Sequence, residues 1–279
     1  MVDHRIGVMQ GRLSPRPEHR LQAFPHQSWP EEFALAKRLG FSYIEWIYEA
    51  ERAQENPIAS AAGRAAIAAC VAESGLPVGS VCGDYFMIHR LSGGTESSRR
   101  ENAAALAELV RWTRALGATR ILLPLLETSA VDTPELKAQV TESIRSVCPA
   151  LETYDVVLGL EMEIPGREYA ELIQGVGHDH VRAYYDTGNS TAQGLDIETD
   201  VLPLLPFLAA VHLKDRMAFG TSRPFGQGNA NFDGFFAVLA RAGYCGDFLT
   251  QHYFDADPEA SAAHSLSFVR RQLRARKAA

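Results

Sequence analysis

The chain has 279 residues, of which 46% are hydrophobic and 22% charged, and a formal net charge of −7. This balance is typical of a globular protein, and the length suits one barrel or two small domains. The acidic excess argues against nucleic acid as the main partner. The charged N-terminus argues against a signal peptide, and no apolar segment approaches membrane-spanning length. We therefore expect a cytoplasmic protein with neither a membrane nor a nucleic-acid partner.

Strand-like and helix-like segments alternate eight times along the chain. The expected strands cover residues 6–10, 43–48, 78–82, 120–126, 156–161, 181–185, 209–213 and 248–251. The expected helices cover residues 30–40, 59–73, 97–116, 134–151, 167–173, 199–205, 233–242 and 258–274, with a break near Cys148-Pro149. Eight such units predict an α/β fold, a single closed (β/α)₈ TIM barrel over residues 1–279. An open doubly wound sheet would normally need a glycine-rich phosphate turn after the first strand, and residues 7–14 contain no GxGxxG.

Four of the expected strands end in side chains that can bind a metal. Glu161, Asp186, His212 and Gln251 occupy corresponding places at or near the ends of four successive strands. The carboxyl ends of parallel barrel strands meet in one mouth, where barrel enzymes place their active sites. Two carboxylates, an imidazole and an amide oxygen suit a divalent ion such as Mn²⁺, Mg²⁺ or Co²⁺, with Zn²⁺ also compatible. Each residue alone has a structural alternative: a helix cap or turn for the two acids, and a hydrogen-bonded core residue for His212.

Further polar residues near the strand ends are candidates for substrate contacts. Glu45 lies inside a strand, where an unpaired carboxylate would be costly, so we expect it to face the cavity. Glu127 is a weaker case of the same kind, and His89 follows the third strand in a loop that could equally be solvent-exposed. The remaining candidates follow the sixth and seventh strands: Asn189, Lys214 and Asp215.

The segments LGLEME, YYDTGN, VHLKD, PFGQGN and YCGDFLTQ carry a family resemblance. Together they resemble the xylose isomerase-like TIM-barrel superfamily, especially its sugar-phosphate isomerases and epimerases of the L-ribulose-5-phosphate 3-epimerase and D-tagatose 3-epimerase groups. The resemblance implies that Glu161, Asp186 and His212 are metal ligands. It also implies substrate contacts for His89 and Arg216. The fourth ligand of the family is a glutamate, and this chain has Gln251 in its place.

The resemblance further implies an enediolate mechanism, in which two glutamates move protons on opposite faces of a ketose. An amide cannot carry a proton near neutral pH, so Gln251 leaves Glu161 as the one catalytic carboxylate of the pair. From the sequence we expect no two-face epimerisation by the native protein. We also expect Gln251→Glu to tighten metal binding and to create or raise C3-epimerase activity.

Three functions remain compatible with these residues. The first is a metal-dependent isomerase that acts on a small sugar or sugar phosphate. The second is a dehydratase or lyase on the same barrel, and the third is a non-catalytic sugar-binding barrel. A DNA-repair endonuclease is disfavoured, because its metal cluster would need more histidines and this chain is acidic. The sequence leaves the metal, the substrate and homo-oligomerisation open.

Overall fold

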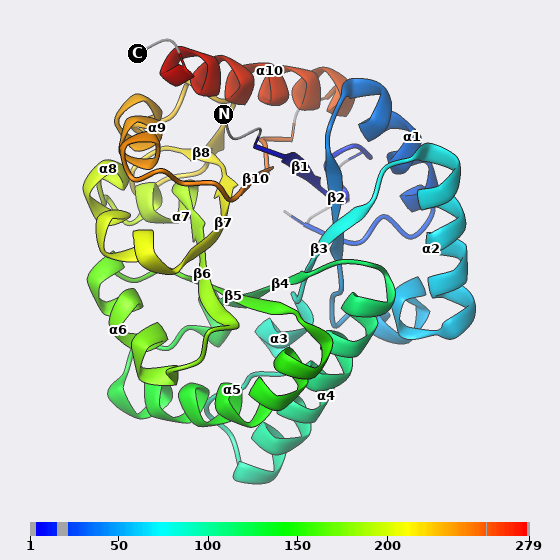
Figure 1. Cartoon of the computed structure of the whole chain (residues 1–279), viewed down its shortest axis with the longest axis vertical. Helices are drawn as coiled ribbons and strands as arrows, with labels where there is room; N and C mark the ends of the chain where they lie inside the picture. The colour runs from blue at the N-terminus through cyan, green and yellow to red at the C-terminus, as the bar shows by residue number, and fades with distance from the viewer. Residues whose placement is uncertain (1–3, 16–21, 255, 278–279) are drawn as a thin grey trace.

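A computed structural model describes residues 4–15, 22–254 and 256–277 and folds them into a closed parallel barrel (Figure 1). The barrel strands are β1 (Ile6–Met9), β2 (Tyr43–Ile47), β3 (Val78–Cys82), β4 (Arg120–Leu125), β5 (Val157–Met162), β6 (Val181–Asp186), β7 (Leu208–Leu213) and β10 (Asp247–Thr250). Each strand pairs in parallel with its neighbours in the chain, and β1 closes the ring by pairing with β10. The predicted (β/α)₈ barrel is confirmed.

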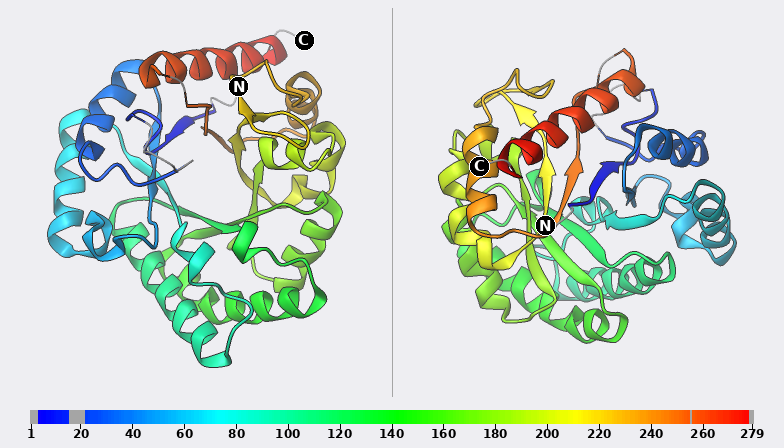
Figure 2. Two further views of the ribbon diagram at one scale, coloured as in Figure 1. Left: turned by 180° about the vertical axis from the view of Figure 1, so that it is seen from behind. Right: turned by 45° about the horizontal axis from the view of Figure 1, so that its top comes forward.

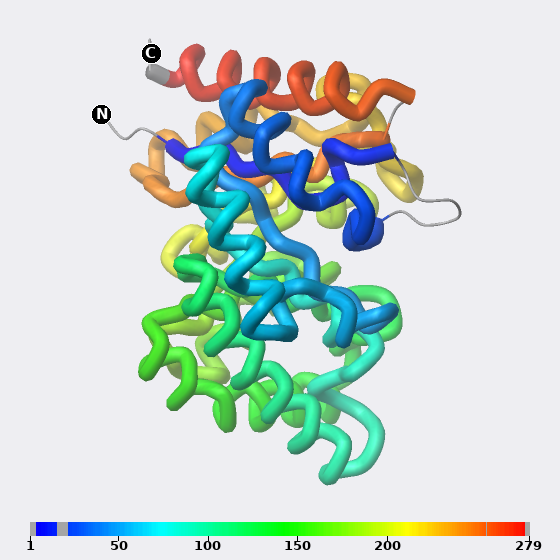
Figure 3. The backbone as a smooth tube through the Cα atoms, turned by 90° about the vertical axis from the view of Figure 1, so that its right-hand side faces the viewer, coloured from blue at the N-terminus to red at the C-terminus, as the bar shows by residue number. Residues whose placement is uncertain are grey.

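Helices connect the strands and form an outer ring around them, seen from two further sides in Figure 2. The longer helices are α1 (Trp29–Leu39), α2 (Ala61–Ser74), α4 (Glu96–Ala115), α5 (Pro134–Tyr154), α6 (Gly166–Val176), α9 (Phe232–Arg241) and α10 (Pro258–Lys277). Figure 3 shows α1, α2 and α4 following one another down one side of the barrel. Among the described residues, no helix has the length and apolar character needed to cross a membrane.

Tyrosine side chains fill part of the barrel interior, where glycines on neighbouring strands make room for them. A Cβ atom at Gly7 or at Gly79 would lie 2.4 Å from the ring of Tyr43. A Cβ atom at Gly159 would lie 2.7 Å from Tyr184. Both tyrosines are fully buried. The close approach of these rings explains why each of the three positions is glycine.

Two helix predictions need correction. Helix α5 continues through Pro149 without the predicted break. Its buried face, which includes Val147 and Leu151, extends on both sides of the proline, so packing against the barrel outweighs one lost backbone hydrogen bond. The segment expected as a helix at 199–205 instead divides into α8 (Ile197–Asp200) and a 3₁₀ segment, η4 (Leu202–Phe207), which contains two prolines.

Several short elements at or near strand ends were not predicted. They are the helices α3 (Tyr85–Ile88) and α7 (Thr187–Ala192), the 3₁₀ turns η1 (Ala53–Glu55), η2 (Pro57–Ala59) and η3 (Glu127–Ser129), and the paired strands β8 (Asp215–Arg216) and β9 (Ser222–Arg223). Each is too short to show a helical or alternating pattern in the sequence. Helix α7 directly follows β6, which ends at Asp186, and the β8–β9 pair follows β7, which carries His212.

Candidate metal centre and active site

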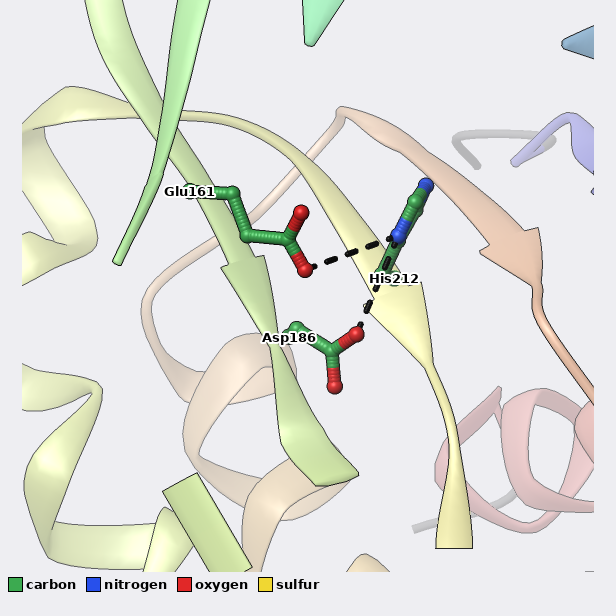
Figure 4. Close-up of side chains that lie close together, drawn as sticks. All are labelled: Glu161, Asp186 and His212. Carbon is green, nitrogen blue, oxygen red and sulfur yellow. Dashed lines mark ion pairs between the residues drawn. The ribbon is translucent and has the colours of Figure 1, made fainter. Parts of the chain in front are cut away.

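Glu161, Asp186 and His212 lie together at the C-terminal mouth of the barrel (Figure 4). They come from three successive strands, β5, β6 and β7, and all three are at most 5% exposed. Nδ1 of His212 lies 3.9 Å from Oε1 of Glu161 and 3.8 Å from Oδ2 of Asp186. Two ligands of one ion, each about 2.1 Å from it, are at most about 4.2 Å apart, so these distances need little adjustment to hold a metal.

Local structure fixes both carboxylates. Oδ1 of Asp186 accepts hydrogen bonds from the backbone N–H groups of Gly188 (2.7 Å) and Asn189 (2.9 Å), and thereby caps α7. Asp186 is therefore both a turn residue and a member of the cluster, because its two oxygens face different ways. Nδ2 of Asn189 donates to Oε1 of Glu161 at 2.9 Å, so the same turn also positions the Glu161 carboxylate.

Glu45 orients the imidazole of His212 through the ring nitrogen Nε2. Its Oε2 lies 2.7 Å from Nε2 of His212, and its Oε1 accepts hydrogen bonds from the hydroxyls of Ser80 (2.7 Å) and Tyr184 (2.8 Å). Burial alone would raise the pKa of Glu45, but His212 and these hydrogen bonds bring the pKa below its usual value. Glu45 faces the barrel interior, where it is fully buried beside His212. A carboxylate on one ring nitrogen leaves the other free for a metal.

The atoms that point into the cluster have the properties of metal ligands. Nδ1 of His212 is buried and has no hydrogen-bond partner within the described part of the chain. Burial raises the pKa of Glu161 well above its usual value, and the adjacent Asp186 carboxylate raises it further. Two buried carboxylates repel each other, and a divalent cation between them would relieve both the repulsion and the desolvation. The donor set fits Mn²⁺, Mg²⁺ or Co²⁺.

Gln251 follows β10 and lies beside the end of β7, because its backbone N–H donates to the carbonyl of Leu213 at 3.0 Å. Its Nε2 donates to Oε1 of Gln22 at 2.6 Å. Its Oε1 is buried and has no hydrogen-bond partner among the described residues. The Gln251 amide therefore has one oxygen that no described donor occupies.

Comparisons with known proteins show which family the chain belongs to. The family model of the xylose isomerase-like TIM barrel matches residues 33–272. The chain belongs to this family. It is 24% identical over 259 residues to the L-ribulose-5-phosphate 3-epimerase of Salmonella paratyphi C (strain RKS4594), covering 88% of this chain and 90% of the relative. It is also 24% identical over 273 residues to a putative L-ribulose-5-phosphate 3-epimerase of Escherichia coli (strain K12), covering 93% and 92%.

Solved structures show the same fold. An L-ribulose 3-epimerase matches with a TM-score of 0.78 and 18% identity, over 99% of this chain and 96% of its own. A D-psicose 3-epimerase, solved in the presence of D-fructose, matches with a TM-score of 0.78 and 17% identity, over 96% and 99%. These named relatives are sugar epimerases, which belong to the isomerases, in agreement with the predicted class of enzyme.

Two cationic side chains of this xylose isomerase-like barrel lie beside the cluster of Glu161, Asp186 and His212. Nζ of Lys214 is 3.2 Å from Oδ2 of Asp186. Burial alone would raise the pKa of Asp186, but Lys214 and His212 lower it and leave it below its usual value. Lys214 also reaches Oδ1 of Asn189 at 3.4 Å, as does Nη1 of Arg216. The structure thus brings these predicted candidates next to the cluster.

The other predicted contact residues lie elsewhere. Asp215 is 2% exposed, and its carboxylate accepts backbone hydrogen bonds from Gly226, Gly228 and Ala230, so it holds the loop that precedes α9. His89 is half-buried and stacks on Tyr85 with ring centroids 4.0 Å apart.

Glu127 is exposed at the start of η3, a turn that contacts α3. No described interaction connects His89 or Glu127 to the metal cluster. Sequence reasoning missed Ser80 and Tyr184, although the alternation of inward and outward side chains along β3 and β6 would have placed both inside the barrel.

Proposed function

We propose that the protein is a metal-dependent sugar isomerase or epimerase that acts on a small ketose or ketose phosphate. The observation that carries this proposal is the buried cluster of Glu161, Asp186 and His212, in which Nδ1 of the histidine has no hydrogen-bond partner among the described residues. The sugar-epimerase names of the relatives support the substrate class. Lys214 and Arg216 at the same mouth provide positive charge suited to hydroxyl groups or a phosphate.

Glu161, Asp186 and His212 would hold the metal, with Oε1 of Gln251 as an additional oxygen ligand. When bound, a divalent ion polarises a carbonyl and so acidifies the neighbouring C–H group. Glu161 takes the proton from that carbon, and burial keeps its carboxylate basic enough for the task. Asn189 fixes the carboxylate through its 2.9 Å hydrogen bond, and Glu45 keeps the proton of His212 on Nε2.

The experiment measures metal binding and proton exchange separately. Isothermal titration with Mn²⁺ should show one site per chain, lost in His212→Ala. The Mn²⁺-loaded protein is then incubated in D₂O with D-fructose, D-psicose, D-tagatose, L-ribulose and L-ribulose 5-phosphate. NMR should show deuterium next to the carbonyl of at least one ketose, and Glu161→Gln should abolish it.

Other outcomes identify the alternatives. Loss of water, seen by mass spectrometry, would indicate a dehydratase or lyase. Sugar binding with neither exchange nor a change in mass would indicate a non-catalytic barrel. The absence of both metal binding and sugar binding would refute the proposal.

A further inference from the structure

A side-chain amide has two ends, and only its oxygen end can act as a metal ligand. We propose that Gln22 is a positioning residue, which turns the oxygen of the Gln251 amide toward the metal and keeps the NH₂ group away from it. This inference rests on the proposed function, in which Oε1 of Gln251 is a ligand. It goes beyond that function by naming the residue that gives this amide its direction.

The side chain of Gln251 lies on the face of its strand that points into the barrel. Leu249 of β10 pairs with His212 of β7. A Cβ atom at Gly7 would meet both Tyr43 and Leu249, so Leu249 points into the interior that Tyr43 fills. Because side chains alternate along a strand, Gln251 lies on the same face as Leu249, two residues closer to the C-terminal mouth.

Gln22 connects Gln251 to Asp84 through two hydrogen bonds that run in one direction. Nε2 of Gln22 donates to Oδ2 of Asp84 at 2.5 Å. Oε1 of Gln22 accepts from Nε2 of Gln251 at 2.6 Å. Each amide therefore donates toward Asp84, and Oε1 of Gln251 remains buried without a hydrogen-bond partner in the described parts of the chain.

The Asp84 carboxylate sets this direction, because an ionised carboxylate accepts hydrogen bonds and cannot donate them. Its other oxygen, Oδ1, accepts from Sγ of Cys82 at 3.1 Å. Burial raises the pKa of Asp84, but the hydrogen bonds from Cys82 and Gln22 favour its ionised form.

Reversing either amide loses a hydrogen bond and brings two acceptors together. If Gln22 turned over, its Oε1 would face Oδ2 of Asp84. If Gln251 turned over, two amide oxygens would face each other, and its NH₂ group would take the place of the unpartnered oxygen. An acceptor left without a donor in a buried place is costly, so the observed direction is the favoured one.

The contact with Gln22 matters because residue 251 is an amide. A glutamate at this position would have oxygen at both ends and would need no partner to orient it. Its carboxylate would also face Oε1 of Gln22, so the contact that directs an amide opposes a carboxylate. The effect of Gln22 on metal binding should therefore depend on the identity of residue 251, whereas a purely structural effect would not.

The test is a double-mutant cycle on Mn²⁺ affinity, measured by isothermal titration. Gln22→Met removes both hydrogen bonds and keeps the length of the side chain. In the native background it should weaken Mn²⁺ binding by about tenfold, a loss usual when a residue that orients a metal ligand is replaced. In Gln251→Glu the same change should leave the affinity within about twofold or tighten it.

Three further variants support the comparison. Gln22→Ala, whose side chain is too short to crowd its neighbours, should repeat both results of Gln22→Met. Gln251→Met should weaken Mn²⁺ binding at least as much as Gln22→Met, because Gln22 acts only through Gln251. Gln174→Met is the matched control, since Gln174 is exposed on α6, and it should leave the affinity unchanged. Thermal unfolding shows that each variant is folded before affinities are compared.

The results separate this inference from the proposed function. Equal losses in the native and Gln251→Glu backgrounds would overturn the role of Gln22, by showing that it supports the mouth whatever residue 251 is. Unchanged affinity of Gln22→Met in the native background would overturn it as well. Either result leaves the proposed function standing if native protein binds Mn²⁺ and exchanges deuterium into a ketose. The absence of Mn²⁺ binding by native protein would refute that function, and this inference with it.

Discussion

Replacing Glu45 by glutamine tests how the protein prepares His212 for a metal. Glu45 is fully buried and uses both oxygens, one facing Nε2 of His212 at 2.7 Å and the other accepting from Ser80 and Tyr184. With a carboxylate at this place, the imidazole proton belongs on Nε2 and Nδ1 remains a lone-pair donor. The substitution keeps the size of the side chain and removes the negative charge that holds the imidazole proton of His212 on Nε2.

The amide has no orientation that satisfies all three partners. If its NH₂ group faces His212, the imidazole proton moves to Nδ1, the atom that must bind the metal. If the NH₂ group faces Ser80 and Tyr184, both hydroxyls must stop donating to that position. Loss of a carboxylate behind a histidine ligand typically weakens metal binding by about 10- to 100-fold. We therefore expect the Mn²⁺ affinity of Glu45→Gln to fall by about 1.4–2.7 kcal/mol.

Isothermal titration with Mn²⁺ measures the effect, with thermal unfolding to confirm that the variant is folded. Glu127→Gln is a suitable control, because Glu127 is exposed and outside the cluster. Nitrogen chemical shifts of His212 would report the tautomer directly. A folded Glu45→Gln protein that binds Mn²⁺ within about twofold of the native affinity would refute the orienting role.

Three further changes have defined outcomes. Gln251→Glu raises the negative charge of the site and should tighten Mn²⁺ binding about tenfold, as measured by titration. This gain is expected even though the new carboxylate faces Oε1 of Gln22. Unchanged or weaker binding would count against Gln251 as a ligand. Burial raises the pKa of Glu32 from 4.5 to about 7, so its stabilising contribution is complete below about pH 4.5 and is lost as the pH rises through about 7. Urea unfolding should show a loss of about 2–3 kcal/mol between about pH 5 and 8 that is absent in Glu32→Gln but retained in the exposed neighbour control Glu31→Gln. Asp215→Ala leaves three backbone N–H groups without their acceptor and should lower the free energy of unfolding by about 2–4 kcal/mol; a smaller loss would mean that the loop finds other partners.

The barrel and the grouping of Glu161, Asp186 and His212 at its mouth were predictable because their signals are local. Each strand is a short apolar segment, and Glu161, Asp186 and His212 stand where such segments end. In a parallel barrel, that position alone brings residues far apart in the chain to one mouth. The turn after Asp186 was also readable, since aspartate followed by Thr-Gly-Asn is a turn-forming sequence.

The contacts around the cluster were not predictable, because they join residues that no spacing relates. Glu45 and His212 are 167 positions apart, and Gln251 and Gln22 are 229 apart. Gln22 belongs to the long loop after β1, which has no periodic pattern to place it over the mouth. Asp84 follows β3 with no pattern that singles it out, and only the structure shows its contacts with Cys82 and Gln22.

The position of Gln22 also bears on what the mouth can accept. Its amide donates to Asp84 and accepts from Gln251, so it lies between these two side chains. A molecule that enters this space must replace one donor and one acceptor, or two buried polar groups lose their partners at a cost of about 1–3 kcal/mol each. A sugar hydroxyl offers both functions in one group, whereas an apolar ligand offers neither. The two hydrogen bonds of Gln22 therefore favour a polyhydroxylated ligand over an apolar one beside Gln251.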